Sequence, residues 1–193
     1  MKIYLASTSP RRKQLLEQIG IDFETIDIDI DETWDGREPA KTYVKRIALE
    51  KAHAAKSKVH NKLPVLAADT CVVLDNVILG KAGTRQDASK MLGELSGRTH
   101  HVYTAVALIT DTEQVRLNIN HVSFRPLSET DILQYCETGE PLGKAGAYAI
   151  QGKAATFIER MEGSYSGVMG LPLYEVAEML KTIKYGYDFR QNP

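Results

Sequence analysis

The first hydrophobic segment of the chain is a short apolar run at residues 3–6, which predicts a strand. A hydroxyl-rich turn follows and leads to Ser9 and Pro10, a typical helix start, because serine caps free N–H groups and proline is pre-set for the first turn. Gly20 can end such a helix. The opening pattern therefore predicts strand, turn and helix in that order.

Four further patterns predict the next elements. Residues 23–30 alternate apolar and acidic side chains, as in a strand with one buried face. After Pro39, apolar positions recur at helical spacing. The continuous apolar run at 63–74 predicts a buried strand. The dipeptide at 75–76 favours a two-residue hairpin turn, which predicts a returning strand at 77–81.

The second half of the chain is also punctuated by local signals. Capping-box spacings at 84–87 and 128–131 predict two helix starts, with strands at 101–110 and 114–124 between them. The remaining predicted elements are a glycine-rich binding loop with a short strand at 140–152, a strand at 155–161, a tight turn at 162–167, a helix with its inner face at 173–180, and a polar, loosely held tail at 185–193.

Length and composition narrow the class of protein. The 193 residues suffice for one substantial core, and 43% hydrophobic with 25% charged residues is ordinary for a soluble domain. No run reaches membrane-spanning length, and the first apolar run is too short for a signal peptide, which predicts a cytoplasmic protein. Cys71 and Cys136 lie far apart, so we expect two small buried hydrophobes rather than a disulfide or a zinc site.

The net charge of −1 argues against a nucleic-acid-binding surface over the whole protein. A positive patch must then be local, and the first turn of the predicted helix offers one. Arg11, Arg12 and Lys13 stand where the helix dipole disfavours cations, beside the hydroxyls of residues 7–9. This arrangement is typical of a polyphosphate cradle. The alternative is a solvated basic helix face.

A carboxylate interrupts the buried strand. Asp69 is costly there unless it is paired or used in chemistry, the alternative being a structural hydrogen bond. Counting back from the hairpin sets Thr70 opposite Lys81 and makes Lys81 a near neighbour of Asp69. Strict alternation places Asp69 on the other face, so direct contact requires the strand to end or bulge at Gly80.

Three further positions are candidates for a site. Lys51 extends the apolar stripe of its helix, either snorkelling to water or reaching a phosphate. Glu32 follows a predicted strand and is a possible metal or water ligand, whereas most neighbouring acids are expected to be a solvated edge. Gln151 in the glycine-rich loop has an amide that can read the polar edge of a base, unless the loop is a plain connection.

Histidines offer no comparable signal. His100, His101 and His121 lack the spacing or the cysteine partner of a metal motif. We expect them mostly on the sheet surface.

Taken in order, several of these motifs resemble the Maf family of nucleoside triphosphate pyrophosphatases over almost the whole chain. The residues that carry the resemblance are Leu5-Ala6-Ser7-Thr8-Ser9-Pro10-Arg11-Arg12, Glu32, Lys51, Ala68-Asp69-Thr70, Lys81, Ala147-Tyr148-Ala149-Ile150-Gln151-Gly152 and Gly170-Leu171-Pro172-Leu173. The resemblance implies a single Maf-like domain over residues 1–193. It also implies a two-lobed α/β fold, with a mixed sheet and flanking helices, similar to inosine triphosphatases. The active site is expected in the cleft between the lobes.

The resemblance further implies hydrolysis of a nucleoside triphosphate to the monophosphate and pyrophosphate, assisted by Mg²⁺ or Mn²⁺. Asp69 matches the family's general base. The positions that match phosphate handling are Ser7, Arg12, Lys51 and Lys81. Glu32 matches an acidic site position, and it and Asp69 are the candidate metal ligands. A homodimer that binds neither nucleic acid nor membrane is expected.

Substrate choice divides this family. Arg12, Thr70 and Gln151 match the dTTP/UTP pyrophosphatase subgroup, which is a nucleotide house-cleaning activity, whereas the 7-methyl-GTP subgroup typically differs at these positions. One alternative is a pyrophosphatase for 7-methyl-GTP or another modified nucleotide. Another is a non-catalytic nucleotide-binding regulator of septum formation, although an acid at position 69 hinders the binding of polyphosphate alone.

Overall fold

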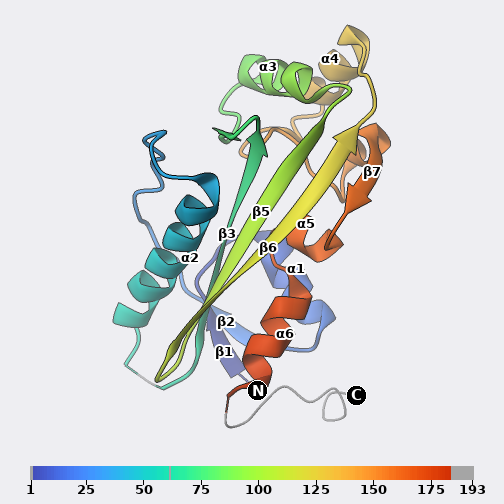
Figure 1. Cartoon of the computed structure of the whole chain (residues 1–193). Helices are drawn as coiled ribbons and strands as arrows, with labels where there is room; N and C mark the ends of the chain where they lie inside the picture. The colour runs from blue at the N-terminus through green and yellow to red at the C-terminus, as the bar shows by residue number, and fades with distance from the viewer. Residues whose placement is uncertain (1, 61, 184–193) are drawn as a thin grey trace.

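A computed structural model describes residues 2–60 and 62–183 and shows a seven-stranded mixed sheet flanked by helices (Figure 1). The strand order is β2-β1-β3-β5-β6-β7, with β4 paired to β3. Only β1 pairs in parallel, with β2 and β3, and the other described pairs are antiparallel. The strands are β1 Lys2–Leu5, β2 Asp22–Thr25, β3 Val65–Leu74, β4 Val77–Leu79, β5 Thr99–Ile109, β6 Glu113–Phe124 and β7 Ile158–Glu162. The predicted α/β class is confirmed.

Helices cover both faces and one end of this sheet (Figure 1). They are α1 Pro10–Gln18, α2 Ala40–Ser57, α3 Arg85–Leu95, α4 Glu129–Glu137, the 3₁₀ helix η1 Lys153–Phe157, α5 Tyr165–Met169 and α6 Leu173–Lys181. Helix α2 packs on one face of β3 and β5, while α1 and α6 pack on the other face. Helices α3 and α4 pack together at the far end of the long strands.

The hydrophobic interior consists of three clusters. Two lie on opposite faces of the sheet at one end, under α2 and under α1 and α6, and the third lies at the other end, under α3 and α4. Strand β3 contributes to all three: Leu66 to the cluster under α1 and α6, Ala67 to the cluster under α2, and Val72 to the cluster under α3 and α4. Strand β5 likewise contributes to all three, from Val102 to Leu108. The two lobes are therefore the two ends of one continuous sheet.

The hairpin turn and the two predicted capping boxes formed, whereas Ser9 stands at the N-cap of α1 without a side-chain capping hydrogen bond. The Asp75 and Asn76 backbones have φ of 50° and 66°, as a type I′ hairpin turn requires, and Leu74 pairs with Val77. Thr84 and Ser128 each close a capping box with the aspartate three residues later. These short-range rules need no tertiary context, which explains their accuracy.

Several predicted strand boundaries were wrong. Strand β2 ends at Thr25, because β1 offers it a pairing partner only from Lys2 to Leu5. No strand forms at 140–152, where turns predominate, and η1 replaces the first part of the strand predicted at 155–161. The turn predicted at 162–167 runs into α5. The tail predicted at 185–193 lies outside the described residues.

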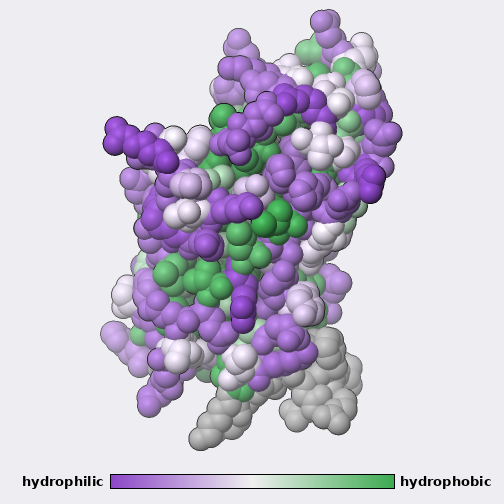
Figure 2. All heavy atoms as spheres, in the orientation of Figure 1, coloured by the Kyte–Doolittle hydropathy of each residue, from purple (hydrophilic) through white to green (hydrophobic). Residues whose placement is uncertain are grey.

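The surface of the molecule is mostly hydrophilic on the side seen in Figure 2. Figure 2 shows that hydrophilic residues cover most of the face presented by α2, β6 and α6, with separate hydrophobic patches between them. Cys71 and Cys136 are buried and unpaired, as expected. Among the described helices, none combines the length and the apolar character needed to cross a membrane.

His100 corrects the prediction that the histidines are sheet-surface residues. Its side chain is fully buried, with Nε2 2.8 Å from the Tyr148 hydroxyl and the ring packed edge-on against Phe124. Burial, reinforced by the charge of His101, lowers the pKa of His100 to about 3. The side chain is therefore a neutral core residue at physiological pH.

This burial predicts a loss of stability in acid. The unfolded chain takes up a proton at His100 near pH 6.5, but the folded protein does so only near pH 3, so stability falls as the pH drops through that window. At pH 5 the loss from this group is about 2 kcal/mol. Urea unfolding at pH 7.5 and 5 should show a smaller difference for His100→Gln than for wild type. The exposed control His60→Gln should retain the wild-type difference, and an unchanged difference in His100→Gln would contradict the assignment.

Candidate active site

A cavity of about 540 Å³ lies where the β1–α1 turn, α2, β3 and the loop before η1 approach one another. Every residue proposed for the site from sequence lines it, from positions spread across the chain: Ser7, Arg12, Glu32, Lys51, Asp69, Thr70, Lys81 and Gln151. The structure therefore gathers the predicted residues in one cleft, although their individual roles stay predictions.

Four charged side chains form an alternating row along one wall of the cleft. Lys81 Nζ lies 3.0 Å from Glu32 Oε2, and Glu32 Oε1 lies 2.7 Å from Lys51 Nζ. Lys51 Nζ in turn donates to Asp69 Oδ1 at 2.7 Å. Burial works to raise the pKa of Glu32, but the hydrogen bonds and charges of Lys51 and Lys81 outweigh it and hold that pKa below its usual value.

Lys51 is a buried ion-pair partner rather than a snorkelling lysine. It lies on the face of α2 that packs on the sheet, and only 8% of its side chain is exposed. Its ammonium bridges Asp69 and Glu32 instead of reaching bulk water. Burying the Asp69 carboxylate in a strand costs free energy, and the Lys51 ammonium from the neighbouring helix α2 compensates this cost.

The predicted cation beside Asp69 was the wrong lysine. Strand β4 ends at Leu79, and Lys81 forms a bridge with Ala145 instead of pairing opposite Thr70. Thr70 pairs with Thr104 of β5 on its other side. Lys81 thus joins the site through Glu32, and the hairpin register cannot be extended past Gly80.

The Arg12 guanidinium faces the opposite wall and bonds to neutral oxygens. Its Nε donates to the Gly170 carbonyl at 2.8 Å, and its Nη1 and Nη2 donate to Ser7 Oγ at 3.3 Å and Thr70 Oγ1 at 3.4 Å. Gly170 has φ of 114°, and a Cβ there would lie 3.3 Å from Thr70 Oγ1. The absence of a side chain at Gly170 thus allows the backbone after α5 to lie close to Arg12 and Thr70. Burial lowers the pKa of Arg12, since no carboxylate is among these three partners.

Sequence reasoning placed two further cations less clearly. Arg11 was recognised only as part of a basic helix turn, and Lys144 was not singled out, yet both line the cleft. Burial lowers the pKa of each, and the charge of Arg11 adds to the effect on Lys144. The negative charge of a phosphate chain between Arg11 and Lys144 would offset the free-energy cost of burying these two cations. The glycine-rich composition of the loop was the only signal for Lys144.

Gln151 projects into the cleft from a loop that the protein holds firmly. Glu140 accepts a hydrogen bond from the Tyr135 hydroxyl at 2.9 Å and from the backbone N–H of Lys153 at 3.1 Å. A Cβ at Gly152 would lie 2.2 Å from Glu140 Oε1, so a side chain at that position would displace the Glu140 carboxylate from these hydrogen bonds. Gln151 itself is exposed, which leaves its amide open to a ligand. The short strand expected here is replaced by turns.

With this geometry established, similarity to known proteins identifies the family. The model of the Maf-like protein family matches residues 2–183. The chain belongs to the Maf family. The resemblance inferred from separate motifs is thereby confirmed over nearly the whole sequence.

Relatives in the Maf family agree closely in length with this chain. The dTTP/UTP pyrophosphatase of Alkalilimnicola ehrlichii is 50% identical over 191 residues, covering 96% of this chain and 95% of its own. Those of Aromatoleum aromaticum and Methylobacillus flagellatus are 48% and 50% identical over 198 and 182 residues. They cover 95% and 93% of this chain, and 96% and 92% of their own.

Similarity to solved structures is weaker. The Ham1 protein of Staphylococcus aureus aligns with 100% of this chain and 93% of its own, at 16% identity and a TM-score of 0.49. A dITP/XTP pyrophosphatase of Mycobacterium abscessus covers 64% of this chain and 73% of its own, at 21% identity and a TM-score of 0.44. Such values support no conclusion about the activity of this chain.

Proposed function

We propose that this Maf-family protein hydrolyses dTTP and UTP to the nucleoside monophosphate and pyrophosphate, a nucleotide house-cleaning activity. The observation that carries the proposal is the composition of the cleft. Asp69 accepts a hydrogen bond from Lys51 there, and Arg11 and Arg12 line the same cleft without a carboxylate partner in their described contacts. Relatives at about 50% identity named dTTP/UTP pyrophosphatase support the same substrate class.

The proposed reaction is attack by water on the α-phosphorus. A new P–O bond forms to the water oxygen, the bond from the α-phosphorus to the α–β bridging oxygen breaks, and pyrophosphate leaves with that oxygen. Asp69 takes the proton of the attacking water. Because Lys51 holds Oδ1, Oδ2 is the oxygen proposed to receive it. Arg12, Lys81 and Lys144 line the cleft where they can offset the charge of the leaving group.

The resident carboxylates also fit a divalent metal ion. Glu32 and Asp69 both line the cleft and share the Lys51 ammonium, each with one oxygen 2.7 Å from its Nζ, so a metal ion would bind their other oxygens or take the place of that ammonium. Within residues 2–60 and 62–183 no group of three or more His, Cys, Asp or Glu is clustered for a metal. Two carboxylates completed by substrate phosphates are a donor set that Mg²⁺ or Mn²⁺ accepts. When bound, the ion would supply charge neutralisation to the phosphates.

The resemblance also supports a homodimer in the cytoplasm that binds neither nucleic acid nor membrane. The balanced net charge of −1 agrees with a small anionic ligand rather than a duplex. Size-exclusion chromatography with light scattering tests the dimer: a mass near twice 21.5 kDa supports it, and a mass near 21.5 kDa contradicts it.

The activity is tested by measuring pyrophosphate and orthophosphate released from dTTP, UTP, CTP, GTP and 7-methyl-GTP with Mg²⁺ or Mn²⁺. Pyrophosphate from dTTP and UTP is the expected result. Preference for 7-methyl-GTP would support the modified-nucleotide alternative. Binding of nucleotides without release of either product would support the regulator and overturn the proposed reaction.

We expect Gln151→Ala to change nucleotide preference more than Arg12→Ala does. The exposed Gln151 amide is free to read a base, whereas a guanidinium facing phosphates acts on every nucleotide alike. The ratio of kcat/KM for UTP and GTP should fall about tenfold in Gln151→Ala and stay within about threefold in Arg12→Ala. Equal losses on both nucleotides in both variants would refute the division of roles.

A further inference from the structure

A hydrogen bond from α2 holds the backbone of Glu32. This residue lies in the segment 26–39, which joins β2 to α2 and contains neither helix nor strand. The Tyr43 hydroxyl donates to the Glu32 carbonyl oxygen at 2.8 Å, and a carbonyl oxygen can only accept. Other bonds, such as that from the Thr33 N–H to Asp31 at 2.9 Å, close turns within the segment. The Tyr43 bond instead ties Glu32 to a helix.

Tyr43 is itself firmly placed. It lies on the buried face of α2 and is only 8% exposed. Its ring packs in the hydrophobic cluster under α2, and the Arg46 guanidinium lies 5.6 Å from the ring centroid. Glu32 lines the cleft, whereas Tyr43 is not among the described residues that do so. An effect of the Tyr43 hydroxyl on a ligand in the cleft must therefore pass through Glu32.

The side-chain and backbone contacts of Glu32 respond differently to a bound cation. Both carboxylate oxygens face an ammonium group, Oε1 that of Lys51 at 2.7 Å and Oε2 that of Lys81 at 3.0 Å. A cation that binds either oxygen must displace one of these groups, so the side-chain contacts change on binding. The Tyr43 bond uses the backbone carbonyl and is kept. It therefore holds Glu32 at the cleft while the carboxylate changes partner.

We propose that Tyr43 is a positioning residue that holds Glu32 ready to receive the divalent cation. This inference deepens the proposed function and rests on it. Without the bond, the segment occupies other positions for part of the time, and the apparent dissociation constant for the cation rises in proportion to that loss. The strength of an ordinary hydrogen bond corresponds to a change of about fivefold.

The test uses Tyr43→Phe, which removes only the hydroxyl. We expect the activation constant for Mn²⁺, measured with UTP, to rise about fivefold. The kcat at saturating Mn²⁺ should stay within about twofold, because cation binding then restores the position of Glu32. Calorimetry with α,β-imido-UTP adds a readout without turnover. Its dissociation constant should rise about fivefold with Mn²⁺ and stay within about twofold in EDTA.

Tyr103→Phe is the matched control. It removes the same hydroxyl from a tyrosine that is also 8% exposed in the same hydrophobic cluster. The described ring contacts of Tyr103 are with His101 and Lys41 rather than with Glu32. Its constants for Mn²⁺ and for the analogue should equal those of wild type. Equal weakening of the analogue with Mn²⁺ and in EDTA in Tyr43→Phe would mean a purely structural role and would overturn the proposal.

A double-mutant cycle tests whether Tyr43 acts through Glu32. Glu32→Gln weakens Mn²⁺ binding by itself, because it removes a charged ligand. If the Tyr43 hydroxyl acts only by placing that ligand, adding Tyr43→Phe should raise the activation constant by less than about twofold more. A full further fivefold rise in this background would overturn the proposal.

Failure of the proposed function is distinguishable from failure of this inference. Hydrolysis of UTP that EDTA does not reduce, or unchanged constants in Tyr43→Phe, would overturn the inference alone. If the wild type releases no product from any nucleotide, the proposed reaction fails, and the dissociation constant of Mn²⁺ alone, measured by electron paramagnetic resonance, decides the inference. A rise in Tyr43→Phe but not in Tyr103→Phe would support it. Equal constants in wild type and Tyr43→Phe, or no Mn²⁺ binding, would overturn it.

Discussion

Asp69→Asn is expected to lower kcat for dTTP by about a thousandfold while nucleotide binding persists or tightens. The amide oxygen of asparagine can still accept from Lys51 Nζ, so the buried contact between β3 and α2 is kept. A carboxamide cannot take a proton from water at neutral pH, so the base is lost. Removing one negative charge also favours an anionic ligand. Single-turnover kinetics and calorimetry with dTTP and Mg²⁺ measure the two effects separately.

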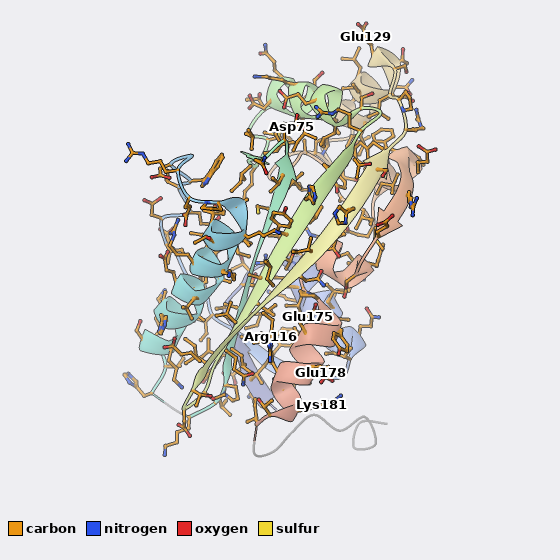
Figure 3. The ribbon with its side chains drawn as sticks, in the orientation of Figure 1. Asp75, Arg116, Glu129, Glu175, Glu178 and Lys181 are labelled. Atoms are coloured by element: carbon orange, nitrogen blue, oxygen red, sulfur yellow. The ribbon has the colours of Figure 1, made fainter. Side chains whose placement is uncertain are left out.

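Asp75→Asn provides a matched control in the turn directly after the same strand. Asp75 follows β3 at the hairpin turn, far from α6, and pairs with Arg98 on the surface (Figure 3). Asparagine tolerates the positive φ of this position, so the turn should form. Its kcat should equal that of wild type. An Asp69→Asn enzyme that retained more than about a tenth of wild-type kcat would rule out Asp69 as the base.

Lys51→Met is expected to reduce the free energy of unfolding by about 3 to 5 kcal/mol. Methionine fills similar space on the buried face of α2, but it leaves Asp69, whose side chain is only 9% exposed, without its cation. Glu32, which approaches the same ammonium, becomes a nearby like charge. Urea unfolding at pH 7.5 measures the loss directly.

Two further variants isolate the cause. Combining Lys51→Met with Asp69→Asn removes the uncompensated charge, so the double variant should regain most of the lost stability. Lys81→Met removes a lysine that is 64% exposed and bonded to Glu32, and should cost less than about 1 kcal/mol. A double variant no more stable than Lys51→Met would show that packing of the lysine stem, rather than charge, is responsible.

The sequence allowed accurate prediction wherever short-range physics decides the outcome. The hairpin at Asp75 and the capping boxes at Thr84 and Ser128 depend on residues within four positions of each other, and all three formed. The buried stripe of α2 and the buried strand β3 follow from apolar periodicity alone. These elements carry Lys51 and Asp69, which the sequence singled out and which the structure brings into contact in one cleft.

Long-range contacts were less predictable. That Lys51 rather than Lys81 reaches Asp69 depends on how α2 lies across β3, which no local pattern encodes. The length of β2 depends on its short partner β1. The sequence thus predicted which residues line the cleft more reliably than it predicted which of those residues contact each other.

The continuity of β3 and β5 through all three hydrophobic clusters has a consequence for how ligands enter. Two lobes joined by loops can rotate about a hinge, but here such a rotation would bend a hydrogen-bonded sheet and disturb clusters at both ends. We therefore expect a preorganised cleft. Discrimination between nucleotides would then depend on fixed hydrogen-bond geometry rather than on induced fit. A nucleotide with the wrong base would bind weakly from the start, instead of binding first and failing to trigger closure of the cleft.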